Sequence, residues 1–201
     1  MIRAVAWDID GTLIDSEPTH HAALMQVSAR YGVSVARDEP RFVGIAMEAV
    51  WETLRPLYHA TLSREQWLDE IVTAYVGAAA ALMPLAGARE AIVALARAGV
   101  RQACVSNSVR RIVEANLARL DLAFEFTIAR EDVARGKPDP EPYALACRRF
   151  GLAPDEVLAV EDSDAGAASA RAAGLRVLRV DAAVFDAVIA QCTPLATPVT
   201  K

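Results

Sequence analysis

The chain has 201 residues, of which 54% are hydrophobic and 23% are charged. This composition supports a buried core and excludes a disordered chain. With 21 basic and 26 acidic residues the net charge is −5, which argues against a protein that binds nucleic acid or a membrane surface, because such partners are polyanions. At roughly 150 residues per domain, the length predicts one domain or one domain with a modest insertion.

The cysteines and lysines of the chain indicate its cellular compartment and which lysine a reaction could use. The 3 cysteines are far apart and suggest no disulfide framework, and the chain reaches Asp8 too early for a signal peptide. The uncharged span 71–88 is rich in alanine and only marginally apolar for a bilayer. We therefore expect a cytoplasmic protein, and this class of protein gives no reason to require more than a monomer. Only two of the 21 basic residues are lysines, Lys137 and Lys201, so a reaction that needs an internal lysine depends on Lys137.

The first predicted strand covers residues 2–7, and a helical insertion follows it. Three helical patterns make up this insertion: residues 20–31, 46–59 and 64–82. No convincing strand interrupts them, and about 70 residues are far too many for a single crossover connection. We therefore expect a helical cap over residues 16–83, with hinges at 15–18 and 83–87.

After the insertion, predicted strands and helices alternate. Short apolar runs predict buried strands at residues 102–106, 126–129, 157–160 and 176–180. Helical patterns accompany them at residues 87–98, 109–120, 140–150 and 165–173. This alternation predicts βαβ units and therefore an α/β fold, a Rossmann-like parallel sheet with helices on both faces. Residues 1–15 and 84–201 would form this core.

Reactive side chains gather where the predicted strands end. They are Asp8 and Asp10 after the first strand, Ser106 and Asn107 after the second, Lys137 after the third, and Glu161 and Asp162 after the fourth. Ligands of an open α/β sheet bind beyond the carboxyl ends of its strands. The sequence therefore predicts that these side chains meet at one edge of the sheet.

The residue types at this edge indicate phosphoryl transfer. Asp8 and Asp10 are two residues apart on an extended segment and point the same way, so their repulsion requires a cation or a shared proton. Further carboxylates nearby suit Mg²⁺, which prefers oxygen ligands. Ser106, Lys137 and loop N–H groups would bind a phosphate. These residues predict magnesium-assisted phosphoryl transfer with a carboxylate nucleophile.

The segment 8–16, DIDGTLIDS, resembles the first motif of the haloacid dehalogenase superfamily. Ser106 resembles its second motif, Lys137 its third, and residues 161–163 its fourth, in the same order over essentially the whole chain. The closest resemblance is to the branch of sugar-phosphate phosphatases and β-phosphoglucomutases, whose fourth motif also reads Glu-Asp-Ser. Trp7 stands where phenylalanine is usual, which changes packing rather than chemistry.

The resemblance implies a catalytic role for each matching residue. Asp8 would attack phosphorus and become an aspartyl phosphate. Asp10 would protonate the leaving alcohol and later activate water. Lys137 would neutralise charge between Asp8 and the phosphate. Ser106 would bind a phosphoryl oxygen, with Asn107 beside it.

The same resemblance implies a Mg²⁺ cofactor. Asp8 and Asp162 would be direct ligands and Asp10 would contribute its backbone carbonyl, with Glu161 at or just outside the ligand shell. Asp164 is expected only to cap the helix that follows. His20, at the start of the first cap helix, is a candidate for substrate binding or acid/base support, because a histidine at the corresponding place contributes to the site of mutase relatives. Solvent-facing polarity is the alternative for His20.

Within the superfamily, the absence of lysine from the cap excludes the phosphonate-cleaving chemistry, which needs a Schiff base. Dehalogenase relatives lack a carboxylate at the place of Asp10. In the mutase a basic residue lies three positions after a glycine that aligns with Gly44, and Met47 stands there. We therefore expect a phosphomonoesterase acting on a small phosphorylated metabolite, a sugar or polyol phosphate. A phosphosugar mutase and a non-catalytic phosphate-binding protein remain as alternatives.

Overall fold

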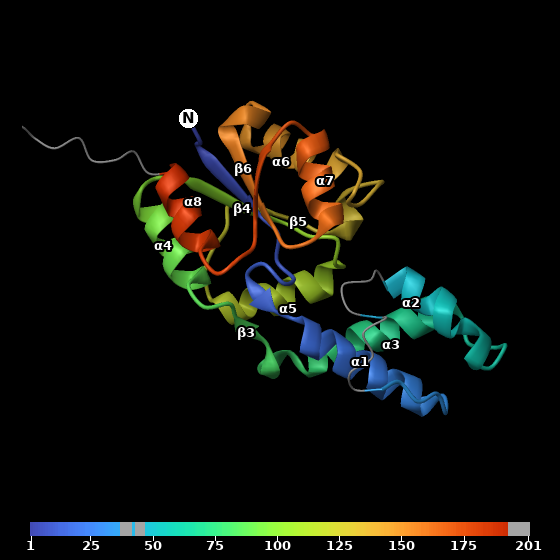
Figure 1. Ribbon diagram of the computed structural model, residues 1–201. Coiled ribbons are helices and arrows are strands. Elements are labelled where there is room, and N and C mark those ends of the chain that lie inside the picture. Colours follow the sequence, from blue (N-terminus) through green and yellow to red (C-terminus); the bar gives the residue numbers. More distant parts are fainter. Residues whose placement is uncertain (37–41, 43–46, 193–201) are drawn as a thin grey trace, which may run out of the picture.

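The computed structural model describes residues 1–36, 42 and 47–192, so that Gly44 lies outside the described residues (Figure 1). Five parallel strands form one sheet in the order β5-β4-β1-β6-β7. The strands are β1 (Ala4–Trp7), β4 (Arg101–Val105), β5 (Thr127–Ile128), β6 (Val157–Glu161) and β7 (Arg176–Arg179). Each falls on a predicted strand, and the predicted Rossmann-like α/β fold is confirmed.

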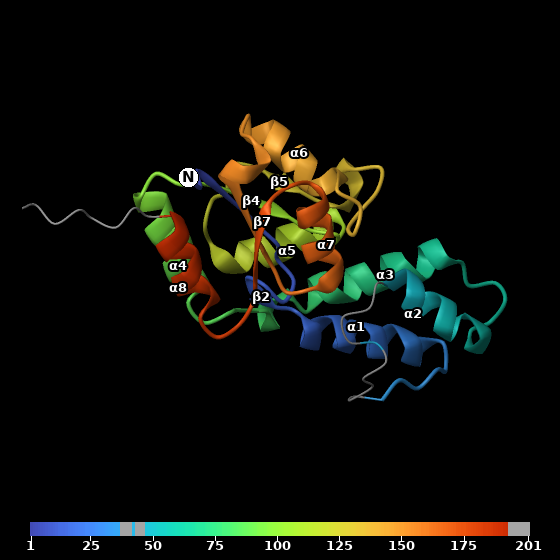
Figure 2. The ribbon, with the colours of Figure 1, turned by 45° about the horizontal axis from the view of Figure 1, so that its top comes forward.

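Helices cover both faces of the sheet, as Figure 2 shows. On one face lie α4 (Ala88–Arg97) and α8 (Val184–Cys192), and on the other α6 (Glu141–Phe150) and α7 (Asp164–Ala172). Side chains of β1 alternate between the two faces: Val5 and Trp7 join the first apolar cluster, Ala4 and Ala6 the second. A strand buried on both faces requires apolar residues at every position, which explains the sequence AVAW.

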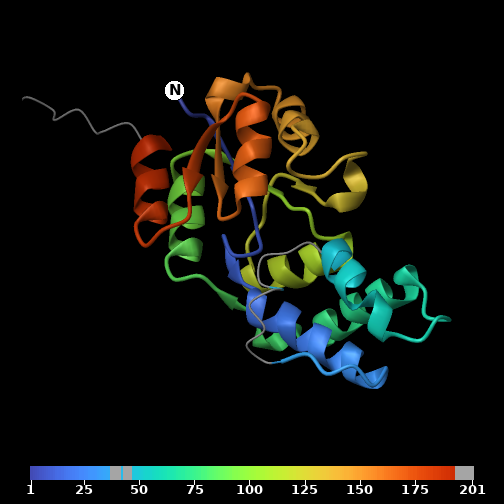
Figure 3. The same ribbon diagram turned by 45° about the vertical axis from the view of Figure 1, so that its right-hand side comes forward.

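The cap consists of α1 (Glu17–Arg30), α2 (Met47–Leu54) and α3 (Arg64–Gly77). A short antiparallel ribbon, β2 (Ile14–Asp15) with β3 (Met83–Pro84), joins these helices to the sheet. The ribbon overlaps the predicted hinges at residues 15–18 and 83–87, and the division into core and cap stays a prediction. Figure 3 shows α5 (Arg110–Leu120) between the sheet and the cap helices.

Aromatic side chains fill the interior of the cap. The Trp51 ring lies 5.3 Å from that of Trp67 and 5.8 Å from that of Tyr58, and the Trp67 indole N–H donates to the Tyr58 hydroxyl at 3.1 Å. This apolar interior is continuous with the sheet face that carries α4, α5 and α8. The cap therefore packs on the core through shared apolar side chains. No helix in the described ranges has the length and apolar character needed to cross a bilayer.

Three segments differ from the sequence predictions. The predicted helix 46–59 ends at Leu54 and continues as a 3-10 turn, because Pro56 lacks the N–H that an α-helix needs. The predicted helix 64–82 ends at Gly77 and is followed by a separate 3-10 turn. Helix α8 was not predicted; it packs against the distant helix α4 and also contacts β7.

Candidate active site

A tight turn after β1 places the first two carboxylates. The backbone N–H groups of Leu13 and Ile14 both donate to the Ile9 carbonyl, at 2.9 and 3.0 Å. Gly11 in this turn has a φ of +75°, and a Cβ there would lie 2.2 Å from Oδ2 of Asp162. A side chain at position 11 would therefore displace the Asp162 carboxylate, so glycine is required both for the turn and for the approach of the two loops.

Lys137 connects the third loop to the buried carboxylates. Its Nζ donates to Oδ1 of Asp8 at 2.7 Å, to Oε1 of Glu161 at 2.5 Å and to the Val105 carbonyl at 2.7 Å. Lys137 is 8% exposed and Glu161 0%. All three ammonium hydrogens are used, so the charge is paired and its position is fixed.

Burial alone would lower the pKa of Lys137, but the carboxylates of Asp8 and Glu161 raise it well above its ordinary value. The ammonium group therefore stays charged. Beneath it, the Tyr143 hydroxyl donates to Oε1 of Glu161 at 2.5 Å, and the Lys137 Nζ lies 5.2 Å from the centre of the Tyr143 ring. Such an arrangement of charge-assisted hydrogen bonds compensates for the removal of these groups from water.

The carboxylates of Asp8, Glu161 and Asp162 fit a hard divalent cation. One oxygen from each lies within 4.8 Å of the others, and Oδ2 of Asp8 is buried without a hydrogen-bond partner among the described residues. Three carboxylates against one ammonium leave two negative charges. Burial and the Glu161 charge raise the pKa of Asp162 to about 6, as expected where like charges lie close together.

The first turn of α7 packs against Glu161. Ser163 caps this helix through a hydrogen bond from the Gly166 N–H at 3.0 Å, so the expectation that Asp164 is the cap is wrong. Asp164 instead pairs with Arg179 at 3.1 Å, because it already lies in the first turn. A Cβ on Gly166 would lie 1.9 Å from Oε2 of Glu161, which means that only glycine lets the helix come this close.

Asp10 lies apart from Lys137 and has its own set of donors. Oδ1 accepts from the Asn116 amide at 2.8 Å and lies 3.4 Å from Nε2 of His20. Oδ2 accepts from Ser108 at 2.8 Å and from Ser106 at 3.4 Å. Burial would raise the pKa of Asp10, but the hydrogen bonds and the His20 contact hold it well below its ordinary value. In this arrangement Asp10 is a carboxylate.

Two residues near Asp10 were not predicted from the sequence: Asn116 and Tyr75. Ser108, which follows Asn107 at the end of the second predicted strand, was expected at this edge but without a role. Asn116 is fully buried on the apolar face of α5. A polar residue inside an apolar stripe was a signal available in the sequence. Tyr75 of the cap helix α3 donates its hydroxyl to Oδ1 of Asn116 at 2.6 Å, and its ring lies 4.3 Å from that of His20. Predicting Tyr75 required knowing how the cap packs.

The side chain of Asn107 forms hydrogen bonds with the backbone of Lys137. Its Oδ1 accepts from the Lys137 backbone N–H at 2.8 Å, and its Nδ2 donates to the Lys137 carbonyl at 3.0 Å. These two bonds fix the backbone from which the lysine extends. Ser106, unlike the exposed Asn107, is buried, and its Oγ accepts from the Ser108 N–H at 2.9 Å. Substrate binding by Asn107 and Ser106 stays a prediction.

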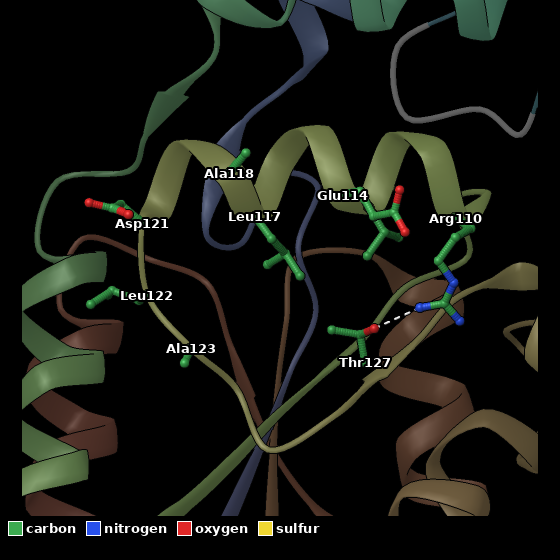
Figure 4. Close-up of a pocket in the computed structure, with 9 residues that line it drawn as sticks. Arg110, Glu114, Leu117, Ala118, Asp121, Leu122, Ala123 and Thr127 are labelled. Carbon is green, nitrogen blue, oxygen red and sulfur yellow. Dashed lines mark hydrogen bonds between the residues drawn. The ribbon is translucent and has the colours of Figure 1, made fainter.

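A separate groove of about 760 Å³ runs along α5. Figure 4 shows Arg110 at one end, where its guanidinium donates to the Thr127 hydroxyl at 2.7 Å. None of the predicted site residues lines this groove. The predicted residues meet at the strand ends instead.

Comparison with known proteins identifies the family of this chain. The family model described as haloacid dehalogenase-like hydrolase matches residues 2–174. The chain belongs to this family. The predicted superfamily and its class, a hydrolase, are thereby confirmed.

Similar proteins include named phosphatases. The chain is 34% identical to validoxylamine A 7'-phosphate phosphatase of Streptomyces hygroscopicus subsp. limoneus, over 87% of this chain and 84% of that protein. It is 30% identical to fructose-1-phosphate phosphatase YqaB of Escherichia coli (strain K12), over 87% of this chain and 94% of that protein. The solved structure of CbbY from Rhodobacter sphaeroides in complex with phosphate is similar, with a TM-score of 0.78 and 29% identity over 88% of this chain and 85% of that one.

Proposed function

We propose that this chain is a magnesium-dependent phosphomonoesterase that hydrolyses a small phosphorylated sugar or polyol through an aspartyl phosphate on Asp8. The observation that carries the proposal is the Asp8 carboxylate, which has one oxygen on the Lys137 ammonium at 2.7 Å and the other without a partner among the described residues. The phosphatases named above, which act on phosphorylated sugars or related compounds, support the substrate class.

In the first step, Oδ2 of Asp8 attacks phosphorus and the bond from phosphorus to the alcohol oxygen breaks. Asp10 gives its proton to that oxygen, and the alcohol leaves. A bound phosphate dianion would raise the pKa of Asp10, since a nearby negative charge disfavours the carboxylate, and so would favour the acid form that this step needs. Lys137 stabilises the negative charge that gathers on the transferring group.

In the second step, water attacks the phosphorus of the aspartyl phosphate. Asp10, now a carboxylate, takes the proton from water, and the bond between phosphorus and the Asp8 oxygen breaks. This releases inorganic phosphate and restores Asp8. The donors around Asp10, with Asn116 and Ser108 both at 2.8 Å, suit the carboxylate form that acts as the base.

Asp8, Glu161 and Asp162 would hold Mg²⁺, with the Asp10 backbone carbonyl as the further ligand implied by the resemblance. Bound there, the ion would neutralise phosphoryl oxygens and help to orient the phosphate. The buried Ser106 hydroxyl, whose Oγ accepts from the Ser108 N–H, would bind a phosphoryl oxygen.

Hydrolysis of p-nitrophenyl phosphate with Mg²⁺ tests the proposal. We expect wild-type turnover that requires the metal, and a loss of about a thousandfold or more in Asp8→Asn, since the nucleophile is removed. Asp15→Asn is the matched control, because Asp15 is exposed in β2 and outside the carboxylate cluster. Absence of wild-type activity across pH and several divalent metals would instead favour a non-catalytic phosphate-binding protein. A panel of phosphorylated sugars and polyols would identify the substrate.

The mutase alternative has less support. A mutase must hold a second phosphate in its cap, but Met47 lies where the mutase has a basic residue, and its side chain packs against the apolar cluster. Incubation with β-glucose 1-phosphate and a bisphosphate primer separates the two activities. Release of inorganic phosphate is the expected result, and isomerised sugar phosphate without phosphate release would show a mutase.

A further inference from the structure

The Asn116 amide has a fixed direction inside the protein. It is fully buried, so both of its polar atoms need partners within the fold. Its Nδ2 donates to Oδ1 of Asp10 at 2.8 Å, and its Oδ1 accepts from the Tyr75 hydroxyl at 2.6 Å. Hydrogen bonds run in one direction, from Tyr75 through Asn116 to Asp10.

The contacts of Asn116 and Ser108 fix the orientation of the Asp10 carboxyl group. Each binds a different oxygen at 2.8 Å, whereas His20 and Ser106 lie 3.4 Å away. Two short bonds to two oxygens determine the plane of the group. Asn116 belongs to α5 and Ser108 to the loop before it, so the core supplies both of these bonds.

Tyr75 connects this arrangement to the cap. It lies on α3, is fully buried, and contacts two of the groups around Asp10: its hydroxyl binds Asn116 and its ring packs on His20 at 4.3 Å. Removing the hydroxyl would leave Oδ1 of Asn116 buried without its donor. The amide could then turn, and the bond that orients Asp10 would weaken.

We propose that Tyr75 and Asn116 are positioning residues that hold the Asp10 carboxyl group in line for proton transfer to the leaving oxygen. This inference rests on the proposed phosphatase function. It assigns Tyr75 an effect through Asn116, without contact with the substrate. Its consequence is that the cap contributes to the acid step as well as covering the site.

Leaving-group dependence tests the inference. Phenyl phosphate and p-nitrophenyl phosphate have leaving groups of similar shape, but phenolate is the more basic and needs the acid more. The value of kcat/KM covers only the steps up to release of the phenol. In Tyr75→Phe, we expect the ratio of kcat/KM for p-nitrophenyl phosphate to that for phenyl phosphate to rise on the order of tenfold. This increase would be part of the rate enhancement that a correctly positioned general acid provides.

Two further variants complete the experiment. Tyr31→Phe is the matched control, because Tyr31 is also a cap tyrosine but its hydroxyl donates to Glu70; its ratio should equal that of the wild type. Asn116→Ser should raise the ratio as Tyr75→Phe does, and the double variant should add little, since both act in one chain of bonds. This second variant also covers the case in which Tyr75→Phe does not fold.

The outcomes separate the inference from the proposed function. An equal loss on both substrates in Tyr75→Phe and Asn116→Ser, or no loss on either, overturns the positioning role while the phosphatase function stands. A wild-type protein that hydrolyses neither substrate overturns the proposed function, and the positioning role with it.

Discussion

Two groups of residues in this molecule hold their carboxylates in different ways. The buried cluster, formed by Asp8, Lys137 and Glu161 with the exposed Asp162 beside it, is built entirely from loops and strands of the core. The donors of Asp10 come from both parts: Ser108 and Asn116 from the core, and His20 from the cap. The proposed nucleophile and cation site are therefore formed without the cap, whereas the proposed proton donor, Asp10, also contacts a cap residue.

Removing the lysine should have the largest effect on the buried cluster. Lys137→Met leaves Asp8 and Glu161 buried without their cation, and we expect kcat/KM to fall about a hundredfold or more and the free energy of unfolding to fall by about 3–5 kcal/mol. Enzyme assays and urea unfolding measure the two effects. Arg148→Met, on the exposed side of α6, is the control and should change neither. A Lys137→Met protein as stable as the wild type would show that the pairing is not needed for the fold.

Metal binding should depend on Asp162 and not on the donors of Asp10. Mg²⁺ that binds only the native state raises the urea midpoint, and we expect Asp162→Asn to weaken this stabilisation by on the order of tenfold in apparent affinity. Asp164→Asn should bind as the wild type, because Asp164 is outside the carboxylate cluster. Equal Mg²⁺ stabilisation of both variants would contradict the assigned site.

Substitution of Gly166 tests how closely helix α7 must approach the Glu161 side chain. An added Cβ would lie 1.9 Å from a Glu161 oxygen, so Gly166→Ala should lower the free energy of unfolding by roughly 1–3 kcal/mol, as overpacking does. Gly77 in α3 has nothing within 4 Å of an added Cβ, so Gly77→Ala should leave stability unchanged or raise it by up to about 1 kcal/mol. Equal effects of the two changes would show that the contact with Glu161 is not tight.

The smallest change in kcat/KM is expected when the cap residue His20 is replaced. His20 lies 3.4 Å from Asp10, so His20→Gln should remove only one weak hydrogen bond, about 0.5–1.5 kcal/mol or roughly twofold to tenfold in kcat/KM. Stabilisation by Mg²⁺ should not change. His21→Gln is the control, since the neighbouring His21 contacts the Ala36 carbonyl instead. A hundredfold loss in His20→Gln would give the cap a direct catalytic role and remove the contrast between the two groups.

The buried cluster could be predicted from the sequence because Asp8 follows β1, Glu161 ends β6 and Lys137 lies in the loop after β5. The parallel sheet brings Asp8, Lys137 and Glu161 to one edge, however the helices pack. Gly11 permits the tight turn after β1. The residues around Asp10 were harder to predict. Asn116 and Tyr75 lie inside helices, and their contacts depend on how α3 packs on α5. Helix α8 was missed for the same reason, since its partner α4 is distant in the sequence.

The most direct test of the account is to trap the phosphorylated residue. Asp10→Asn slows the attack of water, so reaction with p-nitrophenyl phosphate should accumulate the acyl phosphate. Borohydride reduces an acyl phosphate on aspartate to homoserine, and peptide mass mapping then locates the change. We predict homoserine at position 8, dependent on substrate and absent from an Asp8→Asn control. Homoserine at another carboxylate, or none while p-nitrophenol is still released, would contradict the role of Asp8.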